Sequence, residues 1–157
     1  NTHGGSIRIY IKKDKNIEID KNVKKMLKEE EKFGIKNFKT YQDFGEKVYK
    51  IRENVIKNLR KLKKNNEIIV GYGAPAKATS ALNFFGISKE IYYIVDDNKL
   101  KHKKFVPGVN IPIVSKAKIK GNKLTILILA WNFFNEIKEN NKNLSTNFIN
   151  IKSLEKE

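Results

Sequence analysis

The sequence predicts an α/β protein with a Rossmann-like, open and mostly parallel sheet flanked by helices, preceded by an edge strand and two N-terminal helices. Two apolar runs, at 68–70 and 124–130, have the composition of strands buried on both faces. A glycine turn and a helix-capable segment at 76–85 follow the first run, and a helical segment at 134–141 follows the second. This alternation is typical of parallel strands joined by right-handed crossovers.

Length and composition limit the class of protein. The 157 residues suffice for one well-cored domain, or for one domain with a helical appendage. The sequence has no cysteine and two histidines, which excludes a disulfide framework and a thiolate metal site. No apolar run reaches the length of a membrane span, and no signal-peptide pattern opens the chain. We therefore expect a cytoplasmic protein without a membrane partner.

The formal net charge of +16 raises the question of a nucleic-acid partner. The lysines are spread over nearly the whole chain, together with many asparagines and isoleucines, as AT-rich coding sequence produces. No RNA-recognition signature, zinc finger or basic zipper accompanies them. We expect no nucleic-acid partner and keep a basic nucleic-acid-binding module as the weaker alternative, which a steep salt dependence of DNA binding would reveal.

The first segment alternates apolar and polar residues over 7–11, which predicts a half-buried strand at a sheet edge. The sequence begins inside this pattern without an initiator methionine. This start suggests that an upstream domain precedes the sequence.

Two helices are expected next. Apolar residues at helical spacing predict an amphipathic helix over 21–33 that ends at Gly34. A second, long helix is predicted to begin at Thr40, with Asp43 completing a capping-box-like pair. Its narrow apolar seam could face a coiled-coil partner or the domain that follows, and we favour the latter. The seam consists of Phe44, Val48, Ile51, Val55, Leu59 and Leu62.

The turn after the strand at 68–70 has the pattern of a phosphate-binding loop. Gly71, Gly73 and Ala76 match the G-x-G-x-x-G/A template, in which small residues permit a tight turn and close approach to a phosphate. Pro75 stands where a helix tolerates proline, and the helix start would present free N–H groups to an anion. Glycine-rich turns of this kind also occur without a ligand.

A carboxylate follows the second predicted strand, 91–95, about twenty residues beyond the glycine turn. A mononucleotide-binding unit places its sugar-binding acid at this position, so Asp96 is a site candidate. Alternatively, Asp96 and Asp97 cap a turn. In the lysine-rich loop that follows, Lys101 and Lys104 could clamp a pyrophosphate, or could simply be exposed to solvent.

Trp131 and Asn132 follow the strongest buried-strand signal of the chain. Residues at the carboxyl ends of parallel strands line the ligand crevice of an open α/β sheet. Trp131 could therefore supply a stacking face and Asn132 an amide, although Trp131 could equally be a core aromatic. A last strand is expected over 147–151.

Five runs together resemble the C-terminal domain of the nucleotide-sugar C-methyltransferase family. They are His-Gly-Gly-Ser-Ile-Arg at 3–8, Gly-Tyr-Gly-Ala-Pro-Ala-Lys at 71–77, Val-Asp-Asp-Asn at 95–98, Pro-Gly at 107–108 with Ile-Pro at 111–112, and Leu-Ala-Trp-Asn at 129–132. The resemblance spans essentially the whole chain. One departure is Ala78, where family members commonly have glycine.

The resemblance implies a three-part enzyme with a zinc-binding N-terminal domain, a central S-adenosylmethionine-dependent methyltransferase domain, and the Rossmann-like domain seen here. Residues 1–13 would then be the terminal strand of the upstream methyltransferase domain, 14–66 a helical connection, and 67–157 the nucleotide-sugar-binding domain. The chain itself would bind no cofactor. S-adenosylmethionine and zinc would belong to the other domains, and the upstream domain would be its partner.

The resemblance also implies a substrate, a nucleotide-diphosphate sugar, with a thymidine diphosphate sugar as the expected form. Its expected binding residues are Gly71, Tyr72, Gly73, Ala74, Ala76, Lys77, Asp96, Lys101, Lys104, Trp131 and Asn132. Removal of a proton next to a sugar carbonyl needs a base, for which this chain offers His3 at most. We therefore expect no methyl transfer by this chain alone. The alternative is an NAD(P)-binding oxidoreductase domain, which would use the same glycines, although only one mononucleotide half is visible.

Overall fold

The computed structural model describes residues 5–14, 16, 18–65, 67–119, 124–144 and 146–156. It divides into two compact units, Asn1–Val48 and Tyr49–Glu157. The candidate base His3 lies outside the described residues. No helix in the described ranges is both long enough and apolar enough to cross a membrane.

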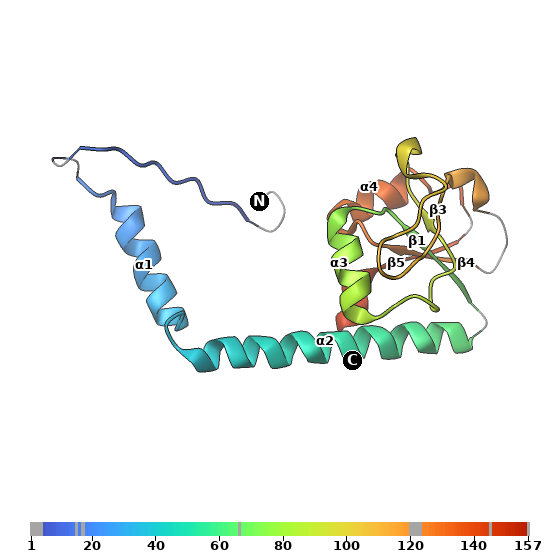
Figure 1. The fold of residues 1–157 in the computed structure, drawn as a ribbon, viewed down its shortest axis with the longest axis horizontal. Coiled ribbons are helices and arrows are strands. Elements are labelled where there is room, and N and C mark those ends of the chain that lie inside the picture. The colour runs from blue at the N-terminus through green and yellow to red at the C-terminus, as the bar shows by residue number, and fades with distance from the viewer. Residues whose placement is uncertain are drawn as a thin grey trace. The chain divides into compact units, whose positions relative to one another are not determined.

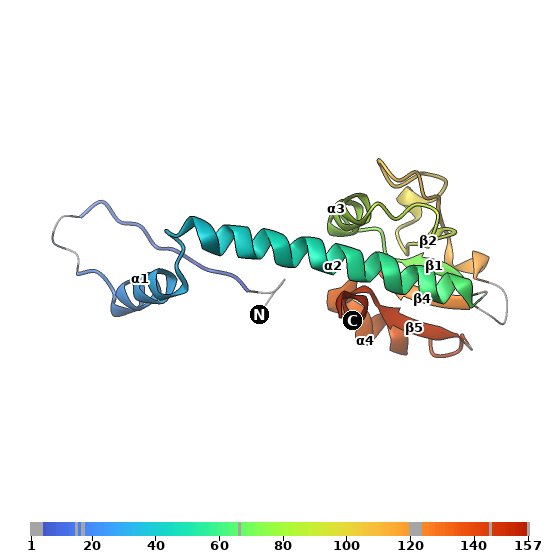
Figure 2. The same cartoon turned by 90° about the horizontal axis from the view of Figure 1, so that it is seen from below.

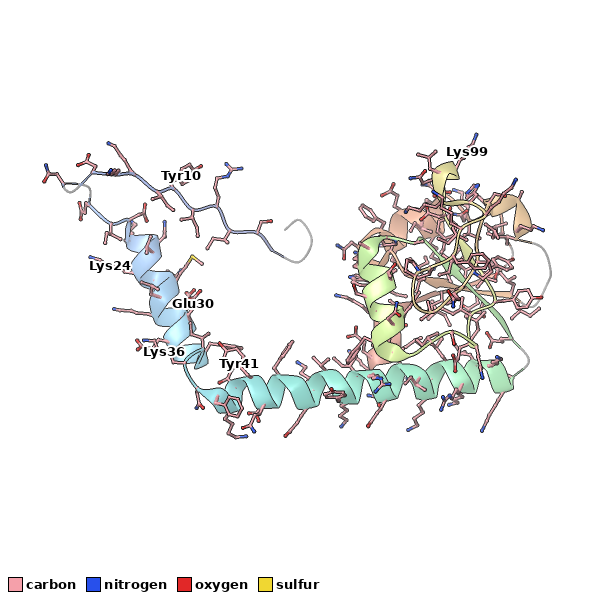
Figure 3. All side chains as sticks on the ribbon, in the orientation of Figure 1. Tyr10, Lys24, Glu30, Lys36, Tyr41 and Lys99 are labelled. Atoms are coloured by element: carbon pink, nitrogen blue, oxygen red, sulfur yellow. The ribbon has the colours of Figure 1, made fainter. Side chains whose placement is uncertain are left out.

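Helix α1, Lys21–Phe33, forms where the sequence predicts it. A carboxylate oxygen of Asp20 accepts the N–H of Asn22 at 2.7 Å, and Gly34 ends the helix in the left-handed conformation with φ of 84°. None of the helix residues is buried, and Figure 3 shows its side chains, including Lys24 and Glu30, standing free around it. The amphipathic pattern thus forms a helix whose apolar side stays exposed within this unit.

The predicted edge strand at 7–11 is not formed. Residues 5–14 are extended but pair with no strand among the described residues, and Ile11 is 92% exposed. Tyr10 of this segment is also exposed (Figure 3). Alternation marks a strand only when a neighbouring strand accepts its hydrogen bonds, and the described part of this unit contains no such neighbour.

Helix α2, Phe38–Lys64, begins earlier than predicted. The Asn37 side chain accepts the N–H of Lys39 at 3.0 Å and so caps the helix. The predicted capping pair is wrong: the Thr40 hydroxyl donates to the Gly34 carbonyl at 2.9 Å, and Asp43 forms an ion pair with Lys39 at 2.7 Å. Asparagine caps as well as threonine does, so the first suitable residue after the glycine starts the helix.

The second unit contains a five-stranded, all-parallel sheet in the order β3-β2-β1-β4-β5. Helix α3, Ala76–Phe85, lies between β1 and β2 in the chain, and α4, Phe134–Glu139, between β4 and β5. This arrangement confirms the predicted fold class. The strands are β1 Ile68–Tyr72, β2 Ile94–Val95, β3 Ile113–Val114, β4 Leu124–Ile128 and β5 Asn147–Asn150, and the short 3-10 helices are η2 Lys99–Lys101, η3 Lys116–Lys118, η4 Trp131–Phe133 and η5 Ile151–Glu155.

Helices cover both faces of this sheet. The core on one face contains side chains of α2, α3 and η5, and the core on the other face packs against α4. Figures 1 and 2 show α4 on the opposite side of the strands from α2 and α3. Val55 and Leu59 of α2 are fully buried, so the apolar seam packs on the sheet from Ile51 to Leu62, as predicted. Phe44, at the start of the seam, is exposed.

Side-chain amides of α2 hold the last 3-10 helix. Asn54 donates to the Glu155 carbonyl at 3.0 Å, and Asn58 donates to the carbonyls of Leu154 and Lys156 at 3.0 and 2.9 Å. Leu154 is buried beneath them. Since these bonds satisfy carbonyls at the end of a helix, they fix the backbone of η5 against α2.

Leu59→Ala tests whether α2 belongs to the core of the second unit. Removing this fully buried side chain should lower the free energy of unfolding by about 2–5 kcal/mol, measured by urea denaturation. Lys57→Ala, on the exposed side of the same helix, should change it by less than about 0.5 kcal/mol. Equal effects of the two substitutions would mean that the helix does not pack as described.

Candidate functional site

The central strands β1 and β4 form the switch point of the sheet. The chain leaves β1 through α3 on one face, and leaves β4 through α4 on the other. In open α/β sheets, ligands bind at the carboxyl ends of strands at such a point. A Cβ atom at Gly73, just after β1, would lie 2.8 Å from the Cβ of Ala130, just after β4. The structure therefore brings the glycine turn beside the segment that carries Trp131 and Asn132.

Glycine is needed at the two positions, 71 and 73, for different reasons. Gly71 lies inside β1, where a Cβ atom would meet Ile94 at 2.8 Å and Leu129 at 3.0 Å, so it permits packing rather than a turn. Gly73 makes the turn itself, with φ of 86°, and its N–H donates to the Val95 carbonyl at 2.7 Å. Close packing against β4 and the positive φ both require glycine at position 73.

Helix α3 starts directly after this turn with its first N–H groups free. Pro75 precedes the helix with φ of −73° and supplies no side-chain cap. Ala78 and Thr79 donate to the Pro75 carbonyl, whereas the N–H groups of Ala76 and Lys77 have no partner among the described residues. Such unpaired N–H groups and the positive end of the helix dipole together favour an anion.

The carboxylate of Asp96 anchors the turn. It accepts the N–H of Ala74 at 2.7 Å, the N–H of Asn98 at 2.9 Å and the Lys101 ammonium at 3.0 Å, and the residue is only 7% exposed. Burial opposes ionisation, but these bonds outweigh it and lower the pKa of Asp96. Asp96 thus accepts backbone N–H groups of a turn, as the alternative interpretation of this residue predicted. A hydrogen bond from a sugar hydroxyl stays a prediction, and would be an additional contact.

The two predicted lysine clamps lie in different surroundings. Lys101 reaches the turn, where its ammonium also donates to the Ala74 carbonyl at 3.1 Å. Lys104 is exposed and forms no hydrogen bond or ion pair with the turn in the described part of the chain. Lys99, in the same loop, points outward in Figure 3. Lys101 is thus already occupied, and a phosphate contact by either Lys101 or Lys104 remains a prediction.

Tyr72 is buried and does not present its side chain at the surface of the candidate site. Its side chain is 4% exposed in the core on the α4 face, and its hydroxyl donates to the Asp97 carboxylate at 2.9 Å. Burial, reinforced by Asp97, raises the pKa of Tyr72 to about 12. Its carbonyl accepts the N–H of Leu129 at 2.9 Å, which continues the pairing of β1 with β4 up to the turn.

Lys77 and Trp131 are in contact beside the start of α3. The Lys77 ammonium lies 4.2 Å from the centroid of the indole ring, and the nitrogen is buried without a hydrogen-bond partner among the described residues. Burial and then repulsion by Lys152 lower the pKa of Lys77. Trp131 is half-buried and packs on the core, as the core alternative predicted, while Asn132 is exposed; stacking of a ligand on Trp131 stays a prediction.

The structure adds residues that the sequence prediction omitted. The His102 ring donates from Nε2 to the Asp96 carbonyl at 2.7 Å, and the Lys152 ammonium lies 5.9 Å from the Trp131 ring centroid. Lys152 is the second residue of η5, which follows β5; the rule on strand ends points to it only once β5 is known to lie beside β4. Among the described residues no cluster of three or more histidines or carboxylates could hold a metal ion.

Asp96→Asn tests the anchor through its pH dependence. Because the pKa of Asp96 is lower in the folded state, its carboxylate stabilises the protein above its unfolded pKa of about 4, and this contribution disappears as the pH falls through the folded value. At neutral pH the substitution should cost about 1.5–3 kcal/mol. Urea denaturation from pH 6 to 2 should show a smaller loss of stability for the variant. Parallel curves would contradict the anchor.

Gly73→Ala tests the turn. The left-handed conformation costs about 1–2 kcal/mol without glycine, and the contact with Ala130 adds to it, so we expect a loss of about 2–4 kcal/mol in urea denaturation. Gly86→Ala is the matched control, because Gly86 also has positive φ but its Cβ would meet only Arg52, at 3.8 Å. A loss no larger than that of the control would show that the Ala130 contact is unimportant.

Comparison with known proteins identifies relatives of this chain. The family model described as C-methyltransferase C-terminal domain matches residues 1–150. C-methyltransferase NovU from Streptomyces niveus is 33% identical over 148 residues, which cover 92% of this chain and 35% of that protein. This chain therefore spans about a third of the length of that relative. Together these matches confirm the resemblance drawn from the five motifs: the chain belongs to the family of C-methyltransferase C-terminal domains.

Proposed function

We propose that this chain is the part of a C-methyltransferase that binds a nucleotide-diphosphate sugar, with the diphosphate at the start of α3. One observation carries the proposal: at the switch point, Ala76 and Lys77 together present two helix N–H groups and one buried ammonium that have no hydrogen-bond partner among the described residues. An ammonium without a hydrogen-bond partner is unfavourable when buried. A bound anion would supply the missing acceptor.

Some backbone N–H groups of the turn hold the fold, and others are available to a ligand. The N–H groups of Gly73 and Ala74 are committed to Val95 and Asp96, whereas those of Ala76 and Lys77 are free among the described residues. A phosphate oxygen at the start of α3 could therefore be bound without breaking any bond that holds the turn. The positive end of the helix would add to this attraction.

The rest of the substrate would extend from the diphosphate toward β4. Trp131 offers an aromatic surface and Asn132 an exposed amide, which can both donate and accept hydrogen bonds. These are suitable contacts for a nucleoside or a sugar, and a thymidine diphosphate sugar is the form we propose. Asp96, if it contacts the sugar, would do so in addition to its role in the turn.

The methyl-transfer chemistry is proposed to lie outside this chain. S-adenosylmethionine would supply the methyl group from an upstream domain of the same protein, and that domain would also supply the base. The one described histidine, His102, is bound to the Asp96 carbonyl. Zinc is likewise assigned to another domain, because this sequence has no cysteine and the described residues form no metal cluster. The chain alone should therefore transfer no methyl group.

Calorimetric titration with a thymidine diphosphate sugar tests the proposal. The chain should bind the sugar, and Lys77→Met, which keeps an unbranched apolar stem over Trp131 but removes the ammonium, should weaken binding about tenfold or more. Lys57→Met, on the exposed face of α2, should leave it unchanged.

Other ligands separate the alternatives. Tighter binding of a nicotinamide dinucleotide than of the nucleotide sugar would support an oxidoreductase domain instead. Salt-sensitive binding to arbitrary DNA, with no binding of nucleotide sugar, would support a nucleic-acid-binding module. Absence of heat with the nucleotide sugar up to millimolar concentration would contradict a site contained within this chain.

A further inference from the structure

We propose that Lys152 is the second cation of the diphosphate site, so that the last 3-10 helix, η5, completes a clamp of two ammonium groups over Trp131. The inference rests on the proposed function and adds to it a residue and a specificity for diphosphate over monophosphate. It follows from three features of the structure. Both ammonium groups lie over Trp131, neither has a described carboxylate partner, and hydrogen bonds fix the backbone of Lys152.

The two lysines meet on one aromatic ring. The Lys77 ammonium lies 4.2 Å and the Lys152 ammonium 5.9 Å from the centroid of Trp131. Lys77 follows β1, Trp131 follows β4 and Lys152 follows β5, and these three strands are adjacent in the sheet. The carboxyl ends of three neighbouring strands thus bring both cations to the same side of the switch point.

Neither lysine has a carboxylate partner among the described residues. Ion pairs of the second unit include Arg60 with Glu90, Lys101 with Asp96 and Lys142 with Glu139, but none in the described ranges includes Lys77 or Lys152. Instead the two like charges lie over the same ring and repel each other; burial first, and this repulsion second, lower the pKa of Lys77. An arrangement of two cations without an anion is electrostatically unfavourable, and a ligand carrying two or more negative charges would relieve it.

The backbone of Lys152 is held firmly although its side chain is exposed. Its N–H donates to the Asn150 side chain at 3.1 Å, and its neighbours Ile151 and Leu154 are buried. The amides of Asn54 and Asn58 fix the following carbonyls to α2. Because the backbone is fixed and the side chain is exposed, a change of rotamer could bring the Lys152 ammonium from the indole to a phosphate oxygen.

The two ammonium groups should make the site prefer diphosphates to monophosphates. A diphosphate can accept one ammonium on each phosphoryl group, whereas a monophosphate offers fewer oxygens to the same pair. Wild-type chain should therefore bind thymidine diphosphate and inorganic pyrophosphate more tightly than thymidine monophosphate and inorganic phosphate. This preference should depend on Lys152 specifically, because Lys77 and the helix N–H groups remain when Lys152 is changed.

Intrinsic fluorescence gives a direct measurement. Trp131 is the single tryptophan of the sequence, so its emission reports the site alone. The full chain would be titrated with the four anions, as wild type and with Lys152→Gln, Lys152→Arg and Lys156→Gln. We expect Lys152→Gln to weaken thymidine diphosphate about tenfold and to remove most of the preference over the monophosphate. Lys152→Arg should retain it, and Lys156→Gln, an exposed lysine four residues further on, should change nothing.

The outcomes separate this inference from the proposed function. Unchanged diphosphate affinity in Lys152→Gln, with normal binding of a thymidine diphosphate sugar, would overturn the clamp and leave the proposed function intact. Binding of pyrophosphate that depends on Lys152, without binding of the nucleotide sugar, would support the clamp and overturn the proposed function. An equal loss in Lys156→Gln would show a general charge effect and would also overturn the clamp.

Discussion

The buried carboxylate of Asp96 is the interaction on which the candidate site depends. It links the end of β2 to the turn after β1 through the N–H of Ala74, and it draws the Lys101 ammonium over the same turn. Without such an acceptor, the N–H of Ala74 would be buried unpaired or would turn toward any anion at the start of α3. The carboxylate therefore decides which backbone donors hold the fold and which stay free for a ligand.

The absence of side chains at Gly71 and Gly73 provides the second constraint. Both positions would bring a Cβ atom to 2.8 Å from a neighbour, Ile94 in one case and Ala130 in the other. Small residues here let β1 approach β2 and the segment after β4 closely enough for the ends of the strands to meet. The meeting of Lys77 with Trp131 across the switch point follows from this close approach. The close packing of the strand ends thus positions the residues that we propose for binding.

Much of the fold could be predicted from sequence, because hydrophobic periodicity reflects burial directly. Helix α1 matches its prediction, and β4, α4 and β5 start where predicted and end one or two residues earlier. The strand predicted at 91–95 is regular only at Ile94–Val95, although Tyr92 still donates to the Ile69 carbonyl. Errors arose where a choice depended on contacts: the cap at Asn37, and the strand at 7–11, which has no described neighbour. Lys152 was missed because its relevance depends on β5 lying next to β4, and strand order is not written in local pattern.

The hydrogen bonds of Asp96 and Asp97 make both carboxylates unsuitable as catalytic bases, which agrees with the proposal that this chain binds substrate and another domain reacts with it. A base that removes a proton next to a carbonyl needs a free lone pair and a pKa near the working pH. Asp96 has a lowered pKa and accepts three hydrogen bonds, and Asp97 accepts the Tyr72 hydroxyl. Moreover, a free carboxylate beside the turn would repel a diphosphate, and Lys101 neutralises the charge of Asp96 there. The contacts that suit this edge of the sheet to an anion are the same ones that make its acids poor bases. If this edge binds a sugar, as we propose, the acid and base groups for a reaction on that sugar would come from another part of the protein.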